Sequence, residues 1–245
     1  MLELIYPQWP APTRVRAAST TRHGGVSKPP YDSLNMGTQV DDDPKDVERN
    51  RMIVTQSLNC PDPLWLKQTH SNTVYHDNGQ TPSEPPVADA AITTHPNRAL
   101  AVLTGDCVPI LFAHHTGEAI AAIHAGWRGL ANNIIEHTLN ELPGNPSDYI
   151  AWIGPCISEQ AYEIGPECQR ALCEAEPAFA NAIVEKESGL YANLPKMAMT
   201  KLTLMRVQHS VCCNLCTFQD PRFFSYRRMG KHSGRMASLI WLSES

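Results

Sequence analysis

The sequence lacks the features that mark membrane, secreted and nucleic-acid-binding proteins. No stretch approaches the roughly eighteen apolar residues of a membrane span. The first twenty residues hold no basic segment followed by an apolar one, so no secretory signal is predicted. The 20 Lys and Arg residues are spread along the chain and outnumbered by 25 acidic residues, and the net charge is −5. We therefore expect a cytoplasmic protein with small-molecule partners, no nucleic acid and no membrane.

The chain also lacks internal repeats, heptads, low-complexity tracts and a long linker. Its 20 prolines lie in short loops, such as 59–63 and 81–86, which do not divide the chain. The 245 residues are 42% hydrophobic, which is enough for a sizeable core. We predict one catalytic domain over residues 1–245, present as a monomer or a homodimer. The eight cysteines of such a cytosolic chain are expected to be free thiols or metal ligands.

Helix and strand patterns alternate along the chain and indicate a mixed α/β (α+β) fold. Asp43 followed by Pro44 predicts the start of a helix over 44–58. Apolar residues at helical spacing predict further helices over 127–142, 166–175 and about 195–211. Runs rich in β-formers predict strands over 99–113, 119–126 and 149–155, and two C-terminal strands in RFFSYRR (222–228) and GRMASLIWL (234–242).

Two apolar strands, 103–113 and 118–126, form a predicted hairpin around residues 114–117. With a loop of two or four residues centred there, the numbers of paired residues sum to 231, so Cys107 lies directly opposite His124. Opposed residues share a face of the sheet, with Cβ atoms about 4.5–5.5 Å apart. A three-residue loop would instead place the two side chains on opposite faces, and both residue types are also common in cores.

The surroundings of the hairpin favour a functional site. Asp106 precedes Cys107, and Arg128 falls in the first turn of a predicted helix, where backbone N–H groups and a guanidinium can hold an anion. His70 stands upstream in a short β-rich segment and is a third candidate ligand. One cysteine with two histidines is a known catalytic zinc set that leaves the fourth position for water or substrate. Spacing alone does not bring His70 to the hairpin.

Several further residues have both a functional and a structural interpretation. Asp106 and Asp89 either orient a histidine ligand or shuttle a proton, or they cap turns. Arg22 and Arg128 either hold phosphate or form salt bridges. Tyr162, with the glutamate that follows it, is typical of loop packing.

A compact cysteine cluster, HSVCCNLC (209–216), has the pattern H-x2-C-C-x2-C, but no second ligand pair follows it at zinc-finger distance. We favour reduced structural thiols over a second metal site. Its candidate ligands are His209, Cys212, Cys213 and Cys216. Cys156 lies in a Pro-Cys loop after a strand, which is an exposed place for a nucleophile, but it has no partnered base in view.

Seven segments, in order over nearly the whole chain, resemble one bacterial family. They are TRHGGVS (21–27), KQTHS (67–71), ADAAIT (88–93), LTGDCVPILF (103–112), IHAGWRGL (123–130), IGPCISEQAYEIG (153–165), and FFSYRR with SGRMASLIWL (223–242). They are similar to the multicopper polyphenol oxidase (laccase)-like proteins. These are also described as zinc-dependent purine nucleoside phosphorylases with adenosine deaminase activity, and as peptidoglycan editing factors.

The resemblance implies a zinc site on His70, Cys107 and His124, which match the family's metal-binding histidines and cysteine. It also implies mixed β-sheets covered by helices, with a distant similarity to cysteine-dependent toxin deamidases. The implied reactions are phosphorolysis of adenosine, inosine and methylthioadenosine, and deamination of adenosine. We take Arg22, Arg128 and Asp106 as candidate substrate-binding residues for the purine nucleoside and phosphate.

Two positions depart from the family pattern, because Met229 and Asn193 stand where an aspartate is usual. Three other functions stay open. Copper-dependent oxidation of phenols is one, although the repeated His-x-His pairs of a multicopper enzyme are missing from the sequence. The second is a hydrolase that edits peptidoglycan precursors with Cys107 as nucleophile and His124 as base. The third is a module that binds zinc without turnover.

Overall fold

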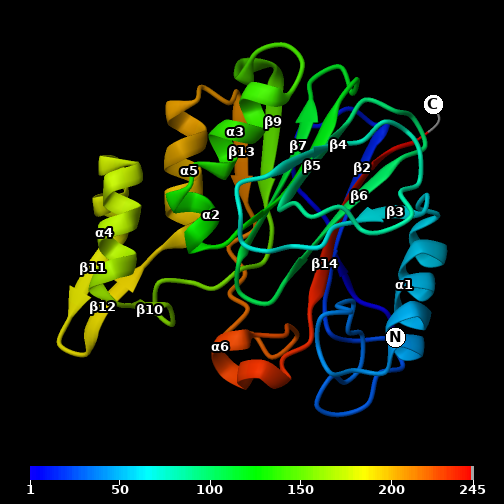
Figure 1. Cartoon of the computed structure of the whole chain (residues 1–245), viewed down its shortest axis with the longest axis horizontal. Coiled ribbons are helices and arrows are strands. Elements are labelled where there is room, and N and C mark those ends of the chain that lie inside the picture. Colours follow the sequence, from blue (N-terminus) through cyan, green and yellow to red (C-terminus); the bar gives the residue numbers. More distant parts are fainter. Residues whose placement is uncertain (244–245) are drawn as a thin grey trace.

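The computed structural model describes residues 1–243 and has the mixed α/β fold expected from the sequence. Two large sheets run through it (Figure 1). One holds, in spatial order, β13 (His209–Cys212), β9 (Tyr149–Ile153), β7 (Val108–His114), β8 (Ile120–Ala125), β5 (Ala90–Thr93) and β4 (Val74–His76). The other holds β1 (Leu4–Ile5), β2 (Val15–Thr20), β14 (Met236–Leu242), β6 (Ala99–Thr104) and β3 (Pro63–Trp65).

Helices cover the outer faces of the two sheets. Figure 1 shows α3 (Ile134–Glu141) and α5 (Leu194–Leu204) on one side and α1 (Pro44–Leu58) on the other. The remaining helices are α2 (Trp127–Ala131), α4 (Pro166–Ala175) and α6 (Tyr226–Met229), with short 3-10 turns at Pro146–Asp148, Pro177–Ala182 and Gly230–His232. A small sheet of β10 (Glu163–Ile164), β12 (Gly189–Ala192) and β11 (Ile183–Lys186) lies beside α4.

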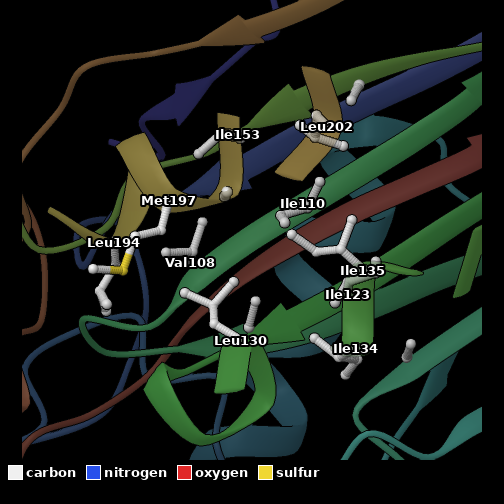
Figure 2. Packing of buried hydrophobic residues seen from close by; sticks show 14 of the residues in the cluster. Val108, Ile110, Ile123, Leu130, Ile134, Ile135, Ile153, Leu194, Met197 and Leu202 are labelled. Atoms are coloured by element: carbon white, nitrogen blue, oxygen red, sulfur yellow. The ribbon is translucent and has the colours of Figure 1, made fainter. Parts of the chain in front are cut away.

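Alternation along the central strands builds two apolar layers. On β7, Ile110 points toward the helices, where Figure 2 shows it among side chains from β8, β9 and the covering helices. Its neighbour Leu111 points the other way and packs between the sheets with Leu100 of β6 and Ile240 of β14. Because β7 is buried on both faces, its sequence is a continuous apolar run. Among residues 1–243, no helix is long and apolar enough to cross a membrane.

Five predicted elements are confirmed with the same or nearly the same bounds. The helix over 44–58 is α1, whose N-cap Asp43 accepts a hydrogen bond from the N–H of Lys45 at 2.9 Å. The chain leaves α1 at Asn59, which has a left-handed φ of 46°. The helix over 166–175 is α4, and the strands over 119–126, 149–155 and 234–242 are β8, β9 and β14. The two helices begin or end at local signals that need no distant partner.

The predicted strand over 99–113 is wrong, because this run forms two strands in different sheets. β6 ends at Thr104, the chain crosses between the sheets, and β7 begins at Val108. Asp106 has a φ of 110° at the crossing. Both strands are buried, so the apolar pattern continues across the break and gives no sign of it.

Three further predictions are also corrected. The helix over 127–142 is broken between α2 and α3 at Asn133, which has a left-handed φ of 58°. The helix over about 195–211 ends with α5 at Leu204, and β13 follows from His209. The segment 222–228 is a loop leading into α6, because its phenylalanines fill a small separate core and the backbone then turns at Ser225.

The register of the hairpin differs from the predicted one by two residues. Paired numbers of β7 and β8 sum to 233, so His124 lies opposite Pro109 and the expected direct pairing with Cys107 is wrong. His114 donates its N–H to the carbonyl of Ala119 at 2.9 Å and closes a loop over 115–118. A shift by two residues keeps each side chain on its face. Cys107, one residue before β7, therefore still falls on the face of His124.

Candidate metal centre

Three ligand atoms from distant parts of the chain meet at the edge of the layer between the sheets. One atom each from His70, Cys107 and His124 lies within 4.8 Å of the others. The separation between Cys107 Sγ and His70 Nε2 is 3.9 Å. His124 belongs to β8 and is buried, Cys107 is half-buried, and His70 sits on the loop between β3 and β4. Within the described residues 1–243, this is the only such group of His, Cys, Asp or Glu side chains.

A buried carboxylate organises both histidines. Asp89 accepts a hydrogen bond from His124 Nδ1 at 2.8 Å, which leaves His124 Nε2 for a ligand. The same carboxylate accepts the backbone N–H of His70 at 3.0 Å, and the backbone N–H and hydroxyl of Ser71 at 2.7 and 2.8 Å. One side chain thereby orients one ligand and fixes the loop that carries another. Such outer partners of a metal-binding histidine set its tautomer and ring orientation.

The charges of the site favour deprotonated sulfur. Burial opposes ionisation of Cys107, but His124 and His70 beside it lower the pKa of the thiol to about 6. Burial likewise opposes the charged form of His124, but the Cys107 thiolate and Asp89 raise its pKa to about 9. Asp89 keeps a pKa well below its ordinary value despite its burial, because His124 and Ser71 stabilise the carboxylate. A divalent cation would take the place of the imidazolium proton, since metal ligation needs thiolate and neutral imidazole.

The donor set and the space around it fit zinc. Ligands at about 2.0–2.3 Å from a tetrahedral zinc lie about 3.5 Å apart, close to the observed sulfur–nitrogen separation. Gly126, at the end of β8, leaves the room that the ligands use. A Cβ there would stand 3.0 Å from Cys107 Sγ and 3.2 Å from His70 Cδ2. Three protein ligands leave a fourth position for substrate or water.

A cavity of about 480 Å³ opens beside the ligands. Aromatic rings and guanidinium groups line it, so it suits a planar ring joined to an anion. Its lining residues are His70, Gly105, Asp106, Cys107, Trp127, Arg128, Tyr162, Tyr226, Arg227 and Arg235. A smaller cavity of about 100 Å³ shares His70 and Arg235 with the first cavity, and it is also lined by Gln68 and His124.

Comparison with known proteins identifies the family to which this fold and site belong. The model of the family described as "Multi-copper polyphenol oxidoreductase laccase" matches residues 16–243. The chain belongs to this family. A relative from Escherichia coli, named "Purine nucleoside phosphorylase YfiH", is 41% identical over 244 residues, which cover 99% of this chain and 100% of that protein.

Further relatives of the chain are similar to it in sequence and in structure. The Pseudomonas aeruginosa protein named "Purine nucleoside phosphorylase PA4543" is 42% identical over 243 residues and 98% of each chain. The crystal structure of Neisseria meningitidis protein NMB0706 superposes with a TM-score of 0.93 at 40% identity, covering 98% of this chain and 99% of that one. The YlmD structure from Geobacillus stearothermophilus gives 0.87 at 29% identity, covering 99% and 100%.

The two arginines weighed from the sequence lie in different places. Arg128 lines the cavity, and its guanidinium stands 4.4 Å from the centre of the Trp127 ring. Arg22 is outside the described lining of both cavities; it pairs with Asp32 at 3.2 Å and lies over the ring of Phe224. The sulfur of Met229, one of the two positions expected to depart from the family pattern, is 3.9 Å from Arg22 Nη1. We therefore leave Arg22 out of the site.

The two aspartates also separate. Asp89 holds His124, whereas Asp106 accepts hydrogen bonds from the Thr217 hydroxyl and the Arg227 N–H, both at 2.6 Å. Burial raises the pKa of Asp106, and these two donors oppose the shift. Both carboxylate oxygens of Asp106 therefore accept hydrogen bonds that tie the segment between β6 and β7 to Thr217 and to the start of α6. Asp106 thus shapes the cavity wall next to Cys107, and we treat it as a positioning residue.

Four lining side chains were missed from the sequence: Trp127, Tyr226, Arg227 and Arg235. Arg227 donates to the Glu163 carbonyl at 2.9 Å and lies 5.0 Å from the centre of the Tyr162 ring. Arg235 donates to the Ser233 carbonyl at 2.6 Å. The segments 223–228 and 233–235 carry the family resemblance, which was the available signal, but a strand was expected in the first of them.

The cysteine cluster at 209–216 forms no ligand group of three within residues 1–243. Its first four residues are β13, which pairs in parallel with β9, and His209 is exposed. Cys156 is only 3% exposed, and burial raises the pKa of its thiol well above the ordinary value. The expectation that Cys156 lies in an exposed place is therefore wrong. Asn193, the second departure from the family pattern, caps α5 and donates its amide N–H to Glu159, which an aspartate cannot do.

Proposed function

We propose that this chain is a zinc-dependent purine nucleoside phosphorylase that also deaminates adenosine. The observation that supports this most directly is the His70, Cys107 and His124 group at the wall of a cavity rich in aromatic rings and arginines. The names of the Escherichia coli and Pseudomonas aeruginosa relatives support the substrate class. The substrates we expect are adenosine, inosine and methylthioadenosine.

The residues of the cavity have distinct tasks in this proposal. Trp127 and Tyr162 offer ring faces on which a purine base stacks. Arg128 and Arg227 provide positive charge for phosphate, and Arg128 lies in the first turn of α2, where free backbone N–H groups add to the attraction. Holding phosphate and nucleoside together places the attacking oxygen at the ribose C1′. The glycosidic C–N bond breaks, a C–O bond to phosphate forms, and the purine leaves with a proton.

The ligand residues prepare the other half of the site. Asp89 holds His124 and the His70 loop, and Cys107 is ready to bind as thiolate. When bound, zinc supplies a Lewis acid that polarises a substrate oxygen and lowers the pKa of a water molecule. Deamination uses the same stacked base, with a water replacing the amino group at C6. Within residues 1–243 there is one ligand group, whereas a multicopper oxidase needs several, so we favour zinc over copper.

A second function is favoured by one specific arrangement. Cys107, His124 and Asp89 are placed as nucleophile, base and orienting carboxylate, with the thiol pKa lowered to about 6. A cysteine hydrolase acting on peptidoglycan precursors uses this arrangement without a metal. Such an enzyme would keep its activity in chelator and would lose it when Cys107 is alkylated.

The deciding experiment measures metal content and product in the same preparations. Wild type, Cys107→Ser and the matched control Cys60→Ser, a free half-buried thiol outside the cavities, are purified with zinc. We expect about one zinc and phosphate-dependent conversion of inosine to hypoxanthine in wild type and control, and neither in Cys107→Ser. Full activity of Cys107→Ser, or full activity after chelation, would contradict the proposal.

Two further measurements separate the remaining functions. Ammonia released from adenosine without phosphate tests deamination, and it should disappear together with phosphorolysis in Cys107→Ser. Oxidation of a phenol by the copper-loaded protein at an enzymatic rate would instead favour the oxidase. Thermal stabilisation by nucleosides with no product formed would indicate a binding module.

A further inference from the structure

Two cysteines lie side by side on paired backbone segments outside the metal centre. Cys156, beyond the end of β9, pairs in parallel with Cys216. Cys156 donates its N–H to the Leu215 carbonyl at 3.2 Å, and Thr217 donates its N–H to the Cys156 carbonyl at 3.0 Å. Neighbouring strands lie about 4.7–4.9 Å apart, within the Cα separations of about 4.4–6.8 Å that disulfides span. Both cysteines are free thiols and line one cavity of about 250 Å³.

The two sulfurs have different environments. Cys216 is half-buried, and its Sγ accepts the Ser158 hydroxyl at 3.0 Å and the Ser158 N–H at 3.3 Å. Because Cys216 is the more exposed of the two, peroxide meets its sulfur first, and the attacking form of cysteine is the thiolate. Cys156 is buried beside it and is placed to resolve an oxidised Cys216, its thiol proton leaving with the hydroxyl of the sulfenic acid. Cys212 lines the same cavity, but it pairs with Ile153 in the sheet.

This thiol pair is joined to the metal centre through Asp106. Ile157, which follows Cys156, donates its N–H to the Asp106 carbonyl at 2.9 Å. Thr217, which follows Cys216, donates its hydroxyl to the Asp106 carboxylate at 2.6 Å. Asp106 directly precedes the ligand Cys107. The residue that follows each cysteine therefore donates a hydrogen bond to Asp106, in the segment between β6 and β7 that carries the candidate ligand Cys107.

We propose that Cys156 and Cys216 are a peroxide-sensitive pair whose reversible disulfide lowers activity at the metal centre by moving Asp106. The Cys216 thiolate attacks one oxygen of hydrogen peroxide, the O–O bond breaks, and the departing hydroxide takes a proton and becomes water. The Cys156 sulfur then attacks the sulfenic acid on Cys216, the S–S bond forms, and a second water leaves. Two electrons pass from the thiols to the peroxide, and a dithiol returns them.

The size of the effect follows from the geometry. Cβ atoms joined by a disulfide lie about 3.8 Å apart, roughly 1 Å closer than the strand spacing. Closing the pair therefore displaces Ile157 and Thr217 relative to Asp106. A misplacement of about 1 Å next to reacting groups costs up to about 10²-fold in rate, and we expect a loss of at least about tenfold. The disulfide does not depend on the proposed function; only the loss of activity rests on it.

The test uses the full-length, zinc-loaded protein, treated with hydrogen peroxide and then with catalase. Under non-reducing conditions, trypsin should yield peptide 129–170 joined to peptide 207–222, with a mass two hydrogens below the sum. The link should persist in Cys168→Ser, Cys212→Ser and Cys213→Ser, the other thiols in these peptides, and vanish in Cys156→Ser and Cys216→Ser. Fragmentation of the linked wild-type peptides locates the two sulfurs even if a variant fails to fold.

The activity arm compares wild type with Cys216→Ser on inosine and phosphate. We expect wild type to lose at least tenfold and to recover in dithiothreitol, while Cys216→Ser keeps its activity. Equal losses in both would assign the effect to oxidation of a metal ligand and overturn the coupling. No link in wild type, or a link through Cys168, Cys212 or Cys213, would overturn the disulfide itself. These mass results hold whatever substrate the enzyme uses.

Discussion

Replacing Asp89 by asparagine should weaken the metal centre without removing a ligand. The side chain keeps its shape, but its charge is lost and one acceptor oxygen becomes an N–H donor facing other donors. The affected partners are His124 Nδ1 and the N–H groups of His70 and Ser71, at 2.7–3.0 Å. Loss of such an outer partner costs about 10–100-fold in metal affinity. This is about 1.4–2.7 kcal/mol, in keeping with one or two hydrogen bonds to a charged group.

The assay is competition for zinc against a chromophoric chelator at pH 7.5. Asp77→Asn is the matched control, because Asp77 is also a buried carboxylate, but it pairs with Arg98 at 2.9 Å and accepts the Thr93 hydroxyl. Both variants should lower the free energy of unfolding, and only Asp89→Asn should lower zinc affinity. A zinc affinity of Asp89→Asn within twofold of wild type, or an equal loss in Asp77→Asn, would refute the role given to Asp89.

Three other predictions follow from the same site. Gly126→Ala should reduce zinc content severalfold, because the added Cβ meets two of the ligands, while the φ of −75° at this position suits alanine. The control Gly165→Ala should keep its zinc, because no atom lies within 4 Å of the added Cβ. Metal analysis checks both variants. Zinc binding should release protons, because His124 is charged below a pKa of about 9 and the Cys107 thiol is protonated below a pKa of about 6, so zinc affinity should rise with pH. Calorimetry in buffers of different ionisation enthalpy measures the release, and binding without proton release would contradict it. Arg128→Gln should raise the KM for phosphate about tenfold and leave that for inosine nearly unchanged, and an unchanged phosphate KM would exclude the residue as an anion ligand.

Sequence was a good guide where an element carries its own end signals. α1 has an aspartate cap and a proline at its start. It ends at Asn59, an asparagine, which is a residue type that adopts the left-handed backbone conformation of a helix end. α4 begins at a proline after a glycine. These signals satisfy the free backbone groups of the first and last turns, and they act within a few residues. Neither helix needed a distant contact to fix its bounds.

Sequence was a poor guide where burial removes the alternation of polar and apolar residues. β6 and β7 are buried on both faces, so their junction at the crossing has no polar interruption long enough to mark a change of sheet. The helix predicted over 127–142 fails for a related reason. Its apolar stripe continues across the break at Asn133, since α2 and α3 cover the same core. In both cases the tertiary packing, and not the apolar sequence pattern, decides where one strand or helix ends and the next begins.

The candidate site divides in the same way. By itself the sequence singled out His70, Cys107 and His124 as candidate ligands, and the parity of a hairpin placed Cys107 and His124 on one face even though the register differed by two. Only the tertiary structure decided that His70 and Asp89 join them, because these contacts close long loops whose ends no local signal relates. The cavity is likewise a tertiary product, since α2 and the segments around α6 come together only when the two sheets pack face to face.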